Sequence, residues 1–103
     1  MDKVGYYVKF RTQAGQRDAL AGLLLQAADH ARDAPGCELY VVNTASGEDD
    51  VVWVTEIWRS AADHTASLSA DGAGELIGQA LPLLAGPPER IDLRPLGGAG
   101  LPG

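Results

Sequence analysis

The sequence has little of several features that would narrow its function. Cys37 is the only cysteine among 103 residues, which rules out an internal disulfide framework and suits a reducing, cytosolic location. Basic residues are scarce as well, with 8 Lys and Arg against 14 Asp and Glu and a net charge of −6. An acidic chain without a basic cluster is a poor ligand for phosphate backbones or anionic lipids. We therefore expect neither a nucleic-acid partner nor a membrane partner.

Long apolar runs and cofactor motifs are also missing. No run approaches the roughly 20 apolar residues of a membrane-spanning helix, and residues 1–4 lack the build of a signal peptide. Residues 98–103 fit the spacing G-x-G-x-x-G, but no helix can follow them in this chain, so they do not predict a dinucleotide site. His30, Cys37 and His64 lack the spacing of metal ligands. The sequence thus predicts no organic cofactor and no metal.

The patterns that are present predict a single α+β domain. Alternating residues indicate strands over 4–11, 37–44, 51–58 and 89–96. Apolar residues at helical spacing indicate a helix over 16–34. They also indicate a second helical arm, which begins after Ser60 as its N-cap, breaks near 71–74 and resumes over 75–84. This βαββαβ order predicts a ferredoxin-like antiparallel sheet with the helices on one face. The domain is expected to span 1–96, and 97–103 to form a flexible Gly/Pro tail.

Two of the predicted strands are apolar on both faces. The stretch Val51 to Val54 reads Val-Val-Trp-Val, whereas a strand with one solvated face should alternate apolar and polar residues. One face packs on the helices, so the other face needs a cover that the chain does not itself supply. We therefore expect a homodimer in which the sheet of a second copy covers that face. In the last strand, Ile91 and Leu93 are expected to point inward.

His64 is the first candidate for acid–base chemistry. With Ser60 as N-cap, His64 occupies the fourth position of the second helix, where the helix dipole favours a neutral imidazole. A neutral histidine can accept a proton near pH 7. Ser67 follows three residues later and so lies on the same helix face. The alternative is a surface histidine on an amphipathic helix, and the residues alone leave both interpretations open.

Glu56 is a carboxylate in an otherwise apolar strand, on the same face as Val54 and Trp58. Burial would raise its pKa and make it a polar anchor or a proton acceptor in a pocket. The alternative, which the residues favour, is a structural salt bridge or hydrogen bond to a neighbouring strand or to a partner chain.

The aromatic residues form a third candidate group, because all of them fall on predicted strands. They are Tyr6, Tyr7, Phe10, Tyr40, Trp53 and Trp58. Tyrosine and tryptophan combine apolar area with one polar tip and suit a flat aromatic ligand, although several must serve in the core or at an interface. Asn43, at the end of the second strand, could orient a carbonyl or a phenol, or could be a turn residue.

Three stretches together resemble the antibiotic biosynthesis monooxygenase family. They are Pro35 to Tyr40 (P-G-C-E-L-Y), Glu56 to Ser60 (E-I-W-R-S) followed by His64 and Ser67, and Leu81 to Pro87 (L-P-L-L-A-G-P), which fits the quinol-monooxygenase-like members. The resemblance covers about residues 4–96. It implies a dimeric α+β barrel and oxygenases of anthrones, quinols and other electron-rich aromatics that use neither metal nor flavin.

The same resemblance implies roles for individual residues. The aromatic substrate would supply the electrons for O₂, so the protein need only deprotonate it, exclude water and hold the ring. His64 would be the base, with Asn43 and Trp58 completing the catalytic set. The substrate would be held by Tyr7, Tyr40, Trp53, Glu56 and Ser67. The implied function is a cofactor-independent monooxygenase of secondary metabolism.

The chain departs from the family pattern at Ser67, where many members have a histidine and haem-degrading relatives have a tryptophan. The haem relatives also carry an asparagine on the first strand and a later haem-ligating histidine, whereas this chain has Tyr6 and Tyr7 and no histidine after His64. Haem degradation is therefore disfavoured. Two alternatives to an oxygenase stay open: a cofactor-free isomerase or cyclase on the same scaffold, and a non-enzymatic small-molecule binding protein.

Overall fold

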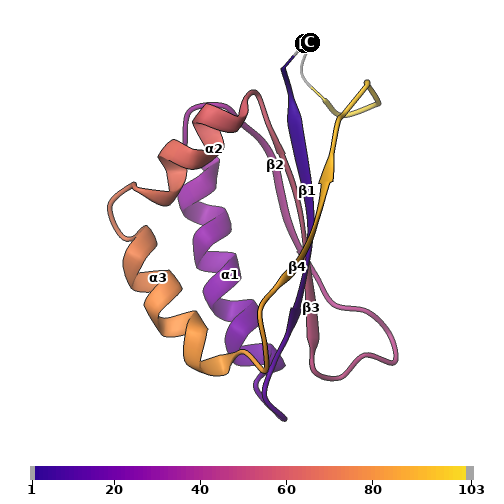
Figure 1. Cartoon of the computed structure of the whole chain (residues 1–103), viewed down its shortest axis with the longest axis vertical. Coiled ribbons are helices and arrows are strands. Elements are labelled where there is room, and N and C mark those ends of the chain that lie inside the picture. The colour runs from indigo at the N-terminus through magenta and orange to yellow at the C-terminus, as the bar shows by residue number, and fades with distance from the viewer. Residues whose placement is uncertain (1, 102–103) are drawn as a thin grey trace.

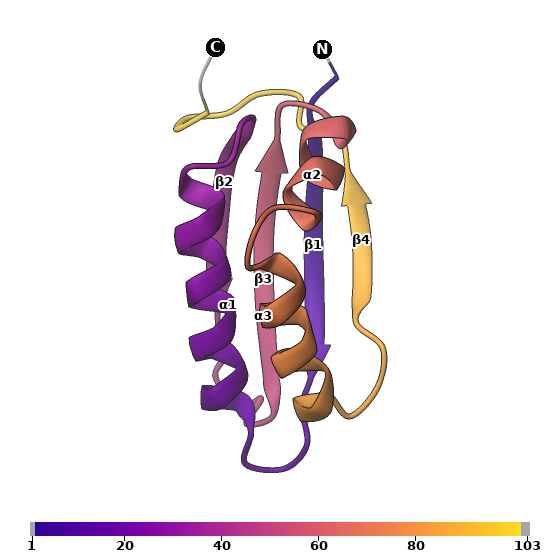
Figure 2. The same cartoon turned by 90° about the vertical axis from the view of Figure 1, so that its left-hand side faces the viewer.

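The computed structural model describes residues 2–101 and shows one sheet with helices on one of its faces (Figure 1). The elements in chain order are β1 (Val4–Arg11), α1 (Arg17–Arg32), β2 (Cys37–Asn43), β3 (Val51–Trp58), α2 (Ala61–Leu68), α3 (Ala73–Ala80), the 3₁₀ turn η1 (Leu81–Leu83) and β4 (Glu89–Leu93). The strands pair antiparallel in the order β2-β3-β1-β4. Seen from the helix side, α1 lies beside the arm formed by α2 and α3 (Figure 2). The predicted ferredoxin-like α+β fold is confirmed.

Four elements differ from the prediction at their ends: α1 and β2 by one or two residues, and the second helical arm and β4 by more. Proline explains much of the two larger differences. The second helical arm breaks as expected, with Gly72 at φ +88° before α3, but its last turn is 3₁₀ instead of α-helical. Pro82 lies in that turn and has no N–H for an α-helical hydrogen bond. Strand β4 ends at Leu93 instead of residue 96, because Leu93 pairs with Gly5 near the start of β1 and Pro95 cannot extend the ladder.

The core lies between the sheet and the helices. Alternate residues of β1 and β3 face the helices, and the register places Tyr6 opposite Glu56 and Val8 opposite Val54. The most deeply buried side chains are Leu20, Val52, Val54 and Trp58. The apolar stripe of α1 thus packs on the apolar face of β2 and β3, and together they form the wall behind the candidate site.

The opposite face of the sheet carries no helix and is rich in aromatic and aliphatic side chains. Tyr7 stacks on Trp53 with ring centroids 4.9 Å apart. Ile91 and Leu93 lie on this face and are 56% and 49% exposed, so the expectation that they point inward is wrong. The register pairs Ile91 with Tyr7 on the open face, which turns the alternate residues of β4 toward the helices. Within residues 2–101, no helix is both long and apolar enough to cross a membrane.

Candidate functional site

A cavity of about 350 Å³ lies between the sheet and the helices. Its floor comes from the helix-facing residues of β1, β2 and β3, and its walls come from α1, α2, α3 and the segment after α3. The polar or part-polar side chains that line it are His30, Tyr40, Glu56, Trp58, His64 and Ser67. The remaining lining residues are apolar. The cavity is therefore a largely apolar site with a small number of polar groups, as small-molecule sites commonly are.

The polar groups of the sheet and of α2 gather at one end of the cavity. Glu56 pairs with Tyr40 across β2 and β3, whereas Phe10, at the other end, pairs with Val52. Glu56 and Val52 are four residues apart along β3, so the two levels are separated by about 13 Å. The second end is closed by the aliphatic side chains of α3, η1 and the loop that follows.

The local structure of α2 positions His64. Ser60 caps the helix by accepting a hydrogen bond from the backbone N–H of Asp63 at 3.1 Å, as the sequence predicts. The imidazole lies against Tyr6 and Trp58, with ring centroids 4.4 and 5.5 Å away. One turn further on, the Ser67 hydroxyl donates a hydrogen bond of 2.6 Å to the backbone carbonyl of His64. The interpretation of His64 as a surface histidine is therefore not supported, because its side chain is only 13% exposed.

Glu56 stands beside this histidine with few compensating charges. Its carboxylate accepts a hydrogen bond of 3.0 Å from the indole N–H of Trp58, and its Oε1 is 3.7 Å from Nε2 of His64. Burial raises the pKa of Glu56, and the Trp58 hydrogen bond and the positive charge of Arg90 only partly oppose that shift. Burial, assisted by Arg90 and opposed by Asp92, lowers the pKa of His64. Both groups are thus displaced toward their neutral forms.

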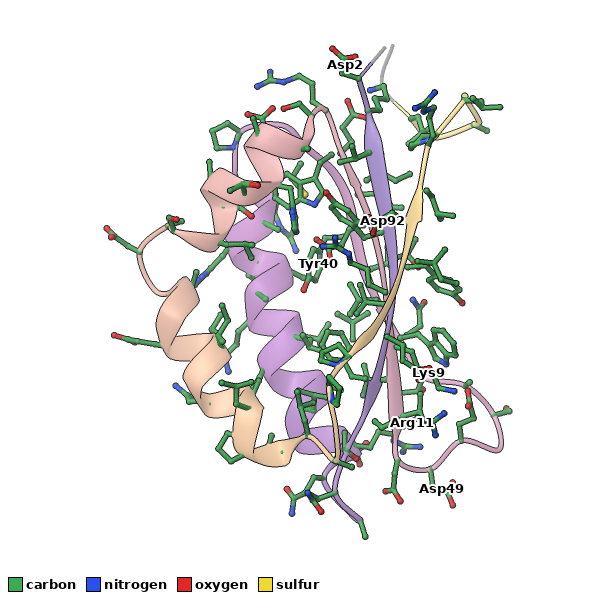
Figure 3. All side chains as sticks on the ribbon, viewed as in Figure 1. Asp2, Lys9, Arg11, Tyr40, Asp49 and Asp92 are labelled. Carbon is green, nitrogen blue, oxygen red and sulfur yellow. The ribbon has the colours of Figure 1, made fainter. Side chains whose placement is uncertain are left out.

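Tyr40 completes the polar end from β2, and its side chain points into the space between the sheet and the helices (Figure 3). Burial raises the pKa of its phenol, and the nearby Glu56 and Cys37 raise it further. Tyr40 is therefore a neutral hydrogen-bonding group at neutral pH. It can donate to or accept from a bound molecule, but it is poorly suited to be an anionic base.

Five of the sequence-predicted site residues meet in this cavity. They are Tyr40, Glu56, Trp58, His64 and Ser67. Tyr7, Trp53 and Asn43 do not join them. Each is separated by an odd number of residues from the helix-facing residues of its own strand, and so its side chain lies on the open face of the sheet. The Asn43 amide donates to the carbonyl of Trp53 and to the hydroxyl of Thr55, each at 3.4 Å. A single pocket containing all eight predicted residues is therefore not what the structure shows.

His30 is a lining residue that the sequence reasoning considered only as a metal ligand. It projects from α1 beneath the turn between α2 and α3, where a Cβ added to Gly72 would lie 3.0 Å from the His30 ring. The signal was present in the sequence, since His30 continues the helical spacing of Leu23 and Ala27. Within residues 2–101, no three His, Cys, Asp or Glu side chains are grouped in a way that could hold a metal ion.

The site can hold a small, largely apolar molecule with one polar group against His64, Glu56 and Tyr40. A neutral imidazole at this end can accept a proton from the bound molecule, and the apolar walls keep bulk water from the reacting group. Proton transfer to a bound organic compound is therefore the chemistry that these residues support.

Comparisons with known proteins agree with this geometry. Residues 4–77 match the family model described as antibiotic biosynthesis monooxygenase. A crystal structure from Chloroflexus aurantiacus, provisionally assigned as an antibiotic biosynthesis monooxygenase, is 37% identical, covers 98% of this chain and 100% of its own, and superposes with a TM-score of 0.89. A search of curated protein sequences found no significant match.

More distant structures share the fold. The Rv0793 protein from Mycobacterium tuberculosis is 22% identical, with a TM-score of 0.83 over 95% of this chain and 99% of its own. SnoaB from Streptomyces nogalater, described as a cofactor-independent oxygenase, is 13% identical, with a TM-score of 0.81 over 96% of this chain and 98% of its own. The family model spans well over half of the chain, and this protein therefore belongs to the antibiotic biosynthesis monooxygenase family.

Proposed function

We propose that this protein is a cofactor-independent monooxygenase that oxidises an electron-rich aromatic compound, of the quinol or anthrone type, with O₂ in secondary metabolism. The observation that carries the proposal is the placement of His64, buried and displaced toward its neutral form, at the polar end of an otherwise apolar cavity. The similarity in fold to SnoaB, described as a cofactor-independent oxygenase, adds support.

The chemistry assigned to the chain is modest. His64 removes a proton from a phenol or from an activated C–H group, and the substrate anion passes one electron to O₂. The substrate radical and superoxide recombine to a C–O bond, and protonation by the imidazolium gives a hydroperoxide. For an anthrone-type CH₂ group, loss of water then leaves a ketone. One oxygen atom enters the product, and the other leaves with the two hydrogens as water.

The other residues of the polar end position the substrate in this scheme. Tyr40 and Glu56 hold the oxygen substituent of the ring by hydrogen bonds, and Trp58 forms the adjoining wall while its indole N–H fixes the Glu56 carboxylate. Holding the reacting carbon near His64 converts a bimolecular proton transfer into an intramolecular one, which is a large part of such catalysis.

The proposal includes a cytoplasmic homodimer. The open face of the sheet exposes Tyr7, Val41, Ile91 and Leu93, with Thr55 of β3 between Val41 and Tyr7. A largely apolar exposed face of this kind marks an interaction surface. The sheet of a second copy would cover it. Trp53 and Asn43 would then belong to the subunit interface, on the other side of the sheet from the chemistry.

Oxygen consumption tests the function directly. The purified protein is treated with a chelator, its absorbance spectrum is recorded, and O₂ uptake is followed with a panel of anthrones and hydroquinones. We expect enzyme-dependent uptake that survives chelation and falls by at least about 100-fold in His64→Ala, the usual scale of a lost general base. The control Thr65→Ala changes an exposed neighbour on the same helix and should leave the rate unchanged.

If treatment with the chelator abolished O₂ uptake, the reaction would depend on a metal ion, and the proposed metal-free mechanism would be wrong. Conversion of a substrate without O₂ uptake would instead identify the isomerase or cyclase alternative. Binding of the aromatic panel with no conversion at all would contradict an oxygenase acting on these compounds and favour the binding protein.

A further inference from the structure

The charges around the cavity restrict the kind of substrate that it can hold. Among the described residues that line it, none is a lysine or an arginine. The cation whose charge acts on Glu56 and His64 is Arg90. Its guanidinium is bound by Asp92 at 2.7 Å and lies over the Tyr6 ring, and neither Arg90 nor Tyr6 lines the cavity. A carboxylate or phosphate on the ligand would therefore lose its hydration without gaining a permanently charged partner, and it could be paired only by protonating His30 or His64.

Glu56 adds a second obstacle to an anionic ligand. Its side chain is only 11% exposed and faces the cavity. A ligand anion near it would be repelled by the ionised carboxylate, or would bind only if Glu56 were protonated. A ligand O–H group meets the opposite situation. A carboxylate offers about four lone-pair sites, and the bond from Trp58 uses one of them, so Glu56 can also accept from a hydroxyl.

The far end of the cavity offers no hydrogen-bonding side chain. Phe10 lies there, about 13 Å along the sheet from Glu56, and Leu84 lies beside the end of β1 opposite Thr12. The lining residues of α3 and η1 are apolar as well. A ligand that reaches this end must present apolar surface there, because each unpaired polar group would lose its water. At about 350 Å³ the cavity lies at the lower end of the range of small-molecule sites, roughly 300–1,000 Å³, and suits a ligand of two or three fused rings or one ring with an alkyl chain.

The geometry points to a neutral, hydroxylated ring compound with an apolar extension as the substrate, and to Glu56 as the residue that selects it against carboxylated and phosphorylated analogues. The hydroxyl donates to Glu56 beside His64, and the extension lies along α3 toward Leu81 and Leu84. This inference rests on the proposed function for the reaction itself, but the selectivity is a property of binding and can be measured without turnover.

A matched set of naphthalenes tests the selectivity in the wild-type protein. 2-Naphthol has the hydroxyl, 2-methoxynaphthalene lacks the donor, and 2-naphthoate carries an anion on the same ring. Calorimetric titration under anaerobic conditions at pH 7.5 should show 2-naphthol binding at least about tenfold more tightly than either analogue, since a lost hydrogen bond to a charged group or an unpaired anion each costs that much or more. Equal or tighter binding of 2-naphthoate would overturn the inference.

Glu56→Gln assigns the selectivity to one residue. The amide keeps an acceptor for the Trp58 indole and removes the negative charge, so the preference for 2-naphthol over 2-naphthoate should fall by about tenfold or more. Glu75→Gln is the control, because it removes one negative charge from the exposed face of α3, outside the cavity. A Glu56→Gln preference equal to that of the wild type would overturn the role of Glu56. If Glu56→Gln does not fold, the titrations of the wild-type protein still test the selectivity.

A series of 4-alkylphenols tests the apolar end. Affinity should rise about three- to fourfold with each added CH₂ until the chain reaches the far end of the cavity, and a flat series would overturn that part of the inference. The oxygen assay separates the two proposals. Selective binding of neutral phenols without any O₂ uptake contradicts the oxygenase and leaves this inference standing. Uptake with a carboxylated substrate, in preference to its neutral analogue, overturns this inference and leaves the oxygenase standing.

Discussion

Nε2 of His64 lies 3.7 Å from Oε1 of Glu56 at the polar end of the cavity. This separation is too long for a hydrogen bond, and burial displaces the pKa of each group toward its neutral form. In each group of this pair, burial therefore makes the charged form less favourable than it would be in water. Shifted pKa values at two adjacent titratable groups that line one cavity are typical of functional sites.

The acid limit of activity should lie below the pKa of an ordinary histidine. The pKa of His64 is lowered, so the imidazole stays neutral and basic as the pH falls through about 6.5. A rate that depends on this base should decline only below that point, as seen in kcat/KM against pH and in NMR titration of the two histidines.

Changing the charged groups that face His64 should shift this pH dependence in known directions. They are Arg90 and Asp92 of β4 and Glu56 of β3. Arg90→Gln removes a positive charge and should raise the pKa of His64, moving the acid limb to higher pH, whereas Asp92→Asn should move it to lower pH. An acid limb at or above 6.5 in the wild type, assigned to His64, would contradict the prediction.

Glu56 should make the stability of the protein depend on pH. Its folded-state pKa is raised above the unfolded value of about 4.3, so its favourable contribution is complete below that value and is lost as the pH rises through the folded-state pKa. Glu56→Gln does not titrate, and its free energy of unfolding should increase relative to that of the wild type between pH 4 and pH 8. Urea unfolding at several pH values measures this. A difference that stays constant over the range would be evidence against the raised pKa of Glu56.

The turn between α2 and α3 should require glycine at residue 72. Gly72 has φ +88°, and a Cβ there would lie 3.0 Å from the His30 ring, so Gly72→Ala should lower the free energy of unfolding by about 1–3 kcal/mol. Gly78 lies inside α3 with open space around its Cα, and Gly78→Ala should raise stability by about 0.5–1 kcal/mol. Thermal and urea unfolding compare the two substitutions. Equal effects of both would show that the turn does not hold Gly72 in the left-handed conformation.

The proposed dimer should depend on the open face of the sheet and not on the helices. Ile91 on β4 and Leu25 on α1 are almost equally exposed, at 56% and 55%, and lie on opposite sides of the molecule. Ile91→Glu should weaken self-association by at least about tenfold, since it replaces an apolar group worth about 1.5–3 kcal/mol when buried, whereas Leu25→Glu should not. Sedimentation equilibrium measures both. Dissociation by Leu25→Glu alone would place the interface on the helices instead.

Much of the fold could be predicted from local patterns. Alternation identified β1, and a run of apolar, β-branched residues identified β3, both with the observed bounds. Ser60 caps α2 through the backbone of Asp63 as expected. The break before α3 could also be predicted, because Asp71, Gly72 and Gly74 do not favour a helix interior. The ends were less predictable where a distant partner decides them. Strand β4 stops at Leu93 because β1 begins opposite it, and Pro95 is the one local sign of that limit.

The candidate site could be predicted only in part. Glu56, Trp58 and His64 were recognised from their types and spacing, and the structure brings them together. Tyr7 and Trp53 have the same chemistry as Tyr40 but lie on the other face. Composition does not distinguish the two sets, because both faces of the strands are apolar. For the same reason, the prediction that Ile91 points inward was wrong.

The sequence by itself determined the elements, their order and the residue types available for chemistry, because hydrophobic spacing, capping and glycine conformation act between residues close in the chain. Only the tertiary structure decided which of those residues share a cavity. Pairing Tyr6 with Glu56, and covering that face with α1 and α2, turned one set of alternate side chains toward His64 and left the other set bare. Register and helix placement depend on contacts between distant segments, and a shift of one residue would exchange the two faces.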